Sequence, residues 1–144
     1  MLDKKFFFKL APNVVNMYRK HTFEKGLDVN GKKFKPYSIK YSKAKKSGKL
    51  KRQSSKFKNT TSPVLTGDLF RDFKVKKIKS DSFSFGTVTH GGKVEGLSKL
   101  GRNISTSSTP IPEKIQKFII KEADNYFMKG MKKNFKDKKI NLNL

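Results

Sequence analysis

The sequence predicts an α+β domain in which a small antiparallel sheet is flanked by an N-terminal and a C-terminal amphipathic helix, with a long basic loop or hairpin between them. Three observations support this fold class. Apolar residues near both ends of the chain recur with the i, i+3, i+4 spacing of a helix. Two short central segments alternate apolar and polar residues, as strands do. The segment before them is rich in Lys, Ser, Gly and Asn, which is loop composition.

The first helix is expected over residues 12–25. Pro12 suits the first helical turn, where its missing N–H is not needed, and Gly26 is placed as the C-terminal stop. The three phenylalanines at 6–8 are expected to form an apolar plug before the helix, as a strand or an extra turn. The apolar stripe of the helix consists of Val14, Met17 and Tyr18.

A short helical turn and a hairpin are expected in the middle of the chain. Thr66 can cap a turn over Asp68–Asp72, because acids are favourable early in a helix. Residues 73–78 and 82–88 then alternate as strands, and Ser80–Asp81 forms the turn between them. Residues 89–110 are expected to be irregular.

The last helix is expected to begin at Pro112 and Glu113 and to run to about Lys129. Gly130 either ends this helix or only weakens it. The single domain is therefore assigned to residues 1–130, and residues 131–144 are expected to be a basic, frayed tail. The apolar stripe of this helix is Ile115, Phe118, Ile119, Ala123, Tyr126 and Phe127.

The charge of the chain is concentrated in one segment. The net charge is +24, and residues 31–62 carry twelve positive charges and no acid. Because self-repulsion at this level opposes compaction, the charge predicts a polyanionic partner: nucleic acid, an anionic membrane surface or an acidic protein surface. Only four basic residues are arginines, which favours sequence-independent contact, although a low-GC genome gives the same bias.

The predicted basic loop covers residues 39–62. Its cations are the candidates for contact with DNA or an acidic partner, and the alternative is a solvated loop without such a role. The aromatic residues Phe34, Tyr37 and Tyr41 either anchor the root of the loop in the core, which we favour, or stack on the bases of a single strand. The candidate contact residues are Lys40, Lys43, Lys45, Lys46, Lys49, Lys51, Arg52, Lys56 and Lys58.

No enzymatic activity, cofactor or metal is expected. The chain has no cysteine and only two histidines, His21 at a helix end and His90 before a glycine pair. A metal-dependent nuclease built on Asp68, Glu95 and His90 is the weakest of three hypotheses, because such a site needs several converging carboxylates. No apolar stretch reaches the 18 residues of a membrane span, and lysines interrupt the apolar N-terminal run, so neither a membrane segment nor a signal peptide is expected.

Three stretches, in order, resemble the virion-morphogenesis or tail-completion proteins of tailed phages, which lie at the neck between head and tail. Residues 29–38, VNGKKFKPYS, look like the family's DG-x-x-W-x-P-L-S segment. Residues 64–73, VLTGDLFRDF, look like L-x-x-T-G-x-L-R-x-S. Residues 86–92, GTVTHGG, followed by TPIP at 109–112, look like VGT…H-x-x-GG…I-P. The positions we expect to act as structural anchors are Phe34, Tyr37, Leu65, Gly67, Leu69, Gly91 and Gly92.

The resemblance implies a structural, non-enzymatic virion protein. It implies a ring of six or twelve copies between the portal or connector and the tail, with double-stranded DNA passing non-specifically through the lumen. The protein would assemble in the host cytoplasm and reside in the neck of the virion. The runner-up hypothesis is a free nucleic-acid-binding accessory protein without sequence preference.

Overall fold

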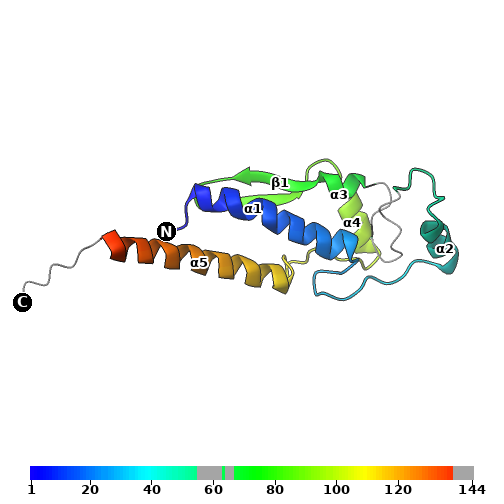
Figure 1. Ribbon diagram of the computed structural model, residues 1–144. Coiled ribbons are helices and arrows are strands. Elements are labelled where there is room, and N and C mark those ends of the chain that lie inside the picture. The colour runs from blue at the N-terminus through cyan, green and yellow to red at the C-terminus, as the bar shows by residue number, and fades with distance from the viewer. Residues whose placement is uncertain (55–62, 64–66, 138–144) are drawn as a thin grey trace, which may run out of the picture.

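The computed structural model describes residues 1–54, 63 and 67–137, with side chains up to residue 133. It confirms the α+β class: a two-stranded antiparallel sheet lies among helices. The hairpin of β1 (Phe73–Ile78) and β2 (Phe83–Thr87), helix α1 (Lys4–Tyr18) and helix α5 (Glu113–Asp137) form three successive layers, with α1 in the middle (Figure 1).

Helix α1 begins eight residues earlier than the sequence predicted. Asp3 is its N-cap, and the Asp3 carboxylate accepts a hydrogen bond from the Phe6 N–H at 2.8 Å. Pro12 therefore lies inside the helix, so its expected place in the first turn was wrong. A π-helix over Arg19–Glu24 continues α1, and Gly26, with a φ of 67°, follows it as the predicted stop.

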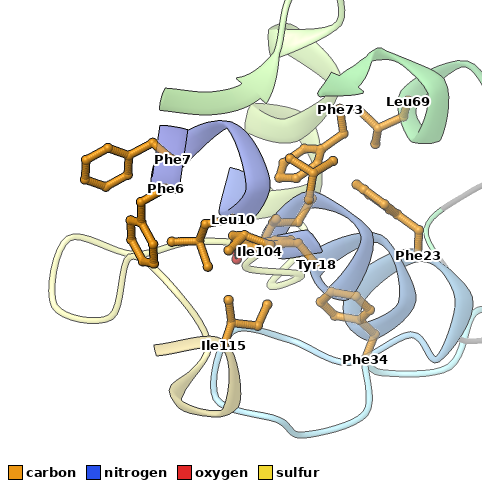
Figure 2. Close-up of a cluster of buried hydrophobic side chains, with 12 residues drawn as sticks. Phe6, Phe7, Leu10, Tyr18, Phe23, Phe34, Leu69, Phe73, Ile104 and Ile115 are labelled. Atoms are coloured by element: carbon orange, nitrogen blue, oxygen red, sulfur yellow. Dashed lines mark hydrogen bonds between the residues drawn. The ribbon is translucent and has the colours of Figure 1, made fainter. Parts of the chain in front are cut away.

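The middle position of α1 explains its run of phenylalanines. Adjacent side chains on a helix point in different directions, so Phe7 packs on Phe83 of the hairpin and Phe6 packs on Tyr126 of α5, with ring centroids 6.0 and 5.0 Å apart. Phe8 remains exposed. Further along α1, Tyr18 packs on Phe73 and donates a hydrogen bond to the Ile104 carbonyl. The resulting aromatic cluster is the core of the molecule (Figure 2).

The predicted hairpin is confirmed. The strands pair Val75 with Phe85 and Lys74 with Gly86, and the Lys79 N–H donates to the Ser82 carbonyl at 2.8 Å across the turn. Val75 and Phe85 pack against the core, so Lys74 and Gly86 lie on the outer face of the sheet.

Two helices lie where the sequence predicted irregular structure, and both predictions were wrong. Helix α2 (Ile39–Ser47) occupies the first part of the expected basic loop, and helix α4 (Gly91–Lys99) occupies the second irregular segment. Both have weak apolar stripes, which is why a search for periodicity missed them.

The remaining two helices agree better with expectation. Helix α3 (Asp68–Asp72) is present as predicted, but its N-cap position is Gly67 and not Thr66, which lies outside the described residues. Helix α5 runs through Gly130 to Asp137, so the domain boundary at 130 and the frayed tail from 131 are wrong over residues 131–137. The expected tail at 138–144 lies outside the described residues.

Candidate polyanion-binding surface

Helix α2 is set by local signals at both ends. The Ser38 hydroxyl accepts a hydrogen bond from the Tyr41 N–H at 3.3 Å, which makes Ser38 the N-cap. Gly48, with a φ of 75°, closes the helix in the left-handed conformation. The helix lies beyond the three layers, at one end of the molecule (Figure 1). We call residues 38–54 the basic arm.

The basic arm presents six of the nine predicted contact residues to solvent. Within the described part of the chain, none of the six forms an ion pair with a carboxylate. Their charges are therefore not neutralised there by acidic side chains. Lys56 and Lys58 lie outside the described residues. The six exposed cations are Lys40, Lys43, Lys46, Lys49, Lys51 and Arg52.

Lys45 is the ninth predicted contact residue, and the structure contradicts its surface role. Its side chain is only 1% exposed, and its Nζ lies 5.3 Å from the centre of the Tyr37 ring. Burial, together with the nearby charge of Arg102, lowers the pKa of Lys45 to about 8. Lys45 attaches the arm to the body of the protein and does not face a partner.

Arg102 is a second cation on the Tyr37 ring, and the sequence did not predict this contact. Its guanidinium carbon lies 4.0 Å from the centre of the Tyr37 ring, and its Nη2 donates to the Lys35 carbonyl at 2.8 Å. Two cations therefore approach one tyrosine, and burial raises the pKa of the Tyr37 hydroxyl. The only hint in the sequence was the choice of arginine in a chain with only four arginines.

Apart from Tyr37, the predicted anchors divide into four groups. Phe34 and Leu69 are buried in the core, and the Phe34 N–H donates to the Gly26 carbonyl at 2.9 Å, so both act as anchors. Gly67 has a φ of 86° and begins α3. Gly91 and Gly92 are exposed in the first turn of α4, so they are not buried anchors, and Leu65 lies outside the described residues.

Asp72 joins α3 to the end of the hairpin, a role that the sequence did not predict. Its buried carboxylate accepts hydrogen bonds from the N–H groups of Val88, Thr89 and His90 at 2.8–3.1 Å, and from the Thr89 hydroxyl at 3.0 Å. Burial alone would raise the pKa of Asp72, but these four donors outweigh it and hold the pKa well below its usual range. Asp72 thus fixes the turn from β2 into α4.

The residues of the nuclease hypothesis pair with other groups. Asp68 lies 2.6 Å from Arg71 and 3.9 Å from Lys93, whereas Glu95 lies 3.3 Å from Lys99. The Nδ1 of His90 lies 3.4 Å from the Asp72 carboxylate. Across the described ranges, no group of three or more His, Asp or Glu side chains is placed to hold a metal ion. His21 contacts the Asp28 carbonyl at 2.7 Å, near the helix end where the sequence placed it.

Comparison with known proteins gives no relative: no family model, curated protein or solved structure matches the chain. Among the helices that the structure describes, none is long and apolar enough to cross a membrane.

Proposed function

We propose that this protein is a structural, non-enzymatic component of a phage neck, forming a ring of six or twelve copies through which double-stranded DNA passes. The observation that carries the proposal is the basic arm. Residues 31–54 contain no acid, and three of the six exposed cations lie on α2 while the other three follow it. Tyr37, at the start of the arm, contacts both Lys45 and Arg102. The proposed location in the neck rests on the three sequence segments that resemble the virion-morphogenesis family.

Lysines on such an arm suit a DNA backbone better than a DNA sequence. Each lysine that neutralises a phosphate releases a condensed counterion, and this gain does not depend on the bases. The absence of arginine forks from α2 fits the same mode, because lysine is a point charge and not a planar, bidentate donor. DNA that moves through a ring needs contacts of this non-specific kind.

The first experiment images the purified protein and labelled phage particles by electron microscopy. We expect rings of the isolated protein and label at the neck, between the portal or connector and the tail. Absence of the protein from the neck would overturn the proposal. A monomer that binds DNA as strongly as any assembled form would instead favour a free nucleic-acid-binding accessory protein.

A second experiment tests the arm. Replacing Lys40, Lys43 and Lys46 by serine should leave the melting temperature unchanged, because all three side chains are exposed. The slope of log affinity for duplex DNA against log salt should become shallower by up to about 3. Serine at Lys114, Lys121 and Lys132 of α5 removes the same charge elsewhere and is the control. An equal loss of slope in both variants would show that the arm has no special role.

A further inference from the structure

Helix α5 carries an apolar face that nothing in the described chain covers. Ile120, Phe127 and Met131 are 61%, 43% and 52% exposed. Together with Asp124 they follow the spacing i, i+4, i+7, i+11, which places all four on one side of the helix. We call these four residues the α5 stripe. A contiguous apolar stripe of this kind is typical of an interaction surface.

The α5 stripe is also unusual in its charge. Residues 120–131 contain two lysines, Lys121 and Lys129, and two acids, Glu122 and Asp124, so this part of the helix is neutral, whereas the whole chain carries +24. Lys114 and Lys121 lie on a different side of the helix by their spacing. Lys117, three residues before Ile120, lies beside the stripe and forms an ion pair with Glu113 at 2.7 Å. Two copies of a strongly basic protein repel each other least where such a surface forms the contact.

The outer face of the hairpin has complementary properties. Lys74 is paired with Gly86, and Lys77 is paired with Ser84, so each lysine stands opposite a small residue. A side chain added at Gly86 would meet no atom within 4 Å, so the space above it is open. The face therefore combines small residues, on which bulky side chains can lie, with lysine stems and positive charge, and a β-bulge between Val75 and Lys77 separates the two lysine pairs.

The two surfaces belong to elements that lie on opposite sides of α1. Phe7 of α1 faces the hairpin and Phe6 faces α5, so α1 separates the two (Figure 1). Complementary surfaces on opposite sides of a subunit produce a head-to-tail contact, which closes into a ring when the rotation between copies allows it.

We propose that the α5 stripe of one copy packs on the outer face of the hairpin of the next copy. Ile120, Phe127 and Met131 then cover Gly86, Ser84 and the lysine stems of the neighbour. Asp124 lies against the ammonium groups of Lys74 and Lys77. This proposal rests on the ring in the proposed function and adds the surfaces that would build it.

The main competing arrangement is a symmetric contact between two α5 stripes. That contact would bring two copies of Asp124 close together and leave the lysines of the hairpin without a negative partner. It would also end at a dimer, because a two-fold contact uses the same surface on both copies. The head-to-tail arrangement avoids both problems.

Cysteine cross-linking separates these arrangements cleanly, because the chain contains no cysteine. The variant with Ile120→Cys and Lys77→Cys, treated with a short bis-maleimide, should give a ladder of dimers, trimers and larger products up to the ring size. Each single-cysteine variant should give no such ladder. Efficient dimers from Ile120→Cys alone would overturn the proposal in favour of the symmetric contact.

A charge substitution supplies the second test. Ile120→Lys should convert rings to monomers in light scattering while the helical circular dichroism is kept, because Ile120 is exposed. Ile39→Lys, at an exposed apolar residue of α2, is the matched control and should still form rings. Rings from Ile120→Lys would overturn this interface and leave the proposed function standing. A wild-type chain that stays monomeric would overturn both.

Discussion

Asp72 and Lys45 are both buried and charged, but the protein treats the two charges in opposite ways. The Asp72 carboxylate has four hydrogen-bond donors from Val88, Thr89 and His90. The Lys45 ammonium lies against the ring of Tyr37 and near a second cation, Arg102. Both pKa values are lowered. For Asp72 a lower pKa favours the charged carboxylate, whereas for Lys45 it disfavours the charged ammonium.

The difference predicts that Asp72 makes a rigid connection between α3 and the end of the hairpin, whereas Lys45 makes a weaker connection between the basic arm and the body. At neutral pH, the negative charge of Asp72 stabilises the folded state, because the hydrogen bonds to the carboxylate outweigh its desolvation. The positive charge of Lys45 instead destabilises the attachment of the basic arm, because burial and the charge of Arg102 both disfavour the protonated amine. We therefore expect the body of the protein, with the α3–hairpin–α4 turn, to be more stable than the attachment of the basic arm.

Asp72→Asn should have the largest effect on stability. The amide keeps the shape of the carboxylate but turns an NH₂ group toward backbone N–H donors, so at least one buried donor loses its acceptor. We expect the melting temperature to fall by roughly 10 °C, measured by circular dichroism. Asp68→Asn, in a more exposed ion pair, is the control and should change it by about 1–2 °C. Equal falls in melting temperature for Asp72→Asn and Asp68→Asn would refute the rigid connection at Asp72.

The same connection predicts loss of stability in acid. The folded pKa of Asp72 lies below its ordinary value, so the unfolded chain binds the extra proton first as the pH falls below about 4. The stabilisation is therefore present above that pH and is lost as the pH falls toward the folded pKa. Urea unfolding between pH 5 and 2 should show a weaker pH dependence for Asp72→Asn than for the wild type.

The sequence predicted the parts of the fold that depend on local patterns. The hairpin alternates with period two, and the stop at Gly26 requires a positive φ, so both were found. The start of α1 was missed because Pro12 suggested a first turn, whereas the Asp3 cap and the burial of Phe6 extend the helix past it. The roles of Lys45, Arg102 and Asp72 depend on contacts between distant segments, which no local pattern records.

Tyr37→Ala should loosen the basic arm without unfolding the body. The substitution removes the ring that contacts both Lys45 and Arg102, and each desolvated cation–π contact contributes about 1–2 kcal/mol. Amide hydrogen exchange in α2 should therefore become at least about tenfold faster, while exchange in α1 changes little. Ile39→Ala, at an exposed residue of α2, is the control. Equal acceleration in α1 would show that the arm and the body unfold together.

Lys45→Met should act most clearly on the pH dependence of stability. The folded pKa of Lys45 is about 8, below the ordinary value of 10.5, so between these values the unfolded chain binds more protons and wild-type stability rises with pH. The rise should be visible between about pH 8 and 10, because above pH 10 the raised pKa values of Tyr18 and Tyr37 act in the opposite direction. Methionine has a similar length and no charge, so the variant should lose this rise in urea-unfolding experiments. A variant that keeps the rise would show that burial does not oppose the charge of Lys45.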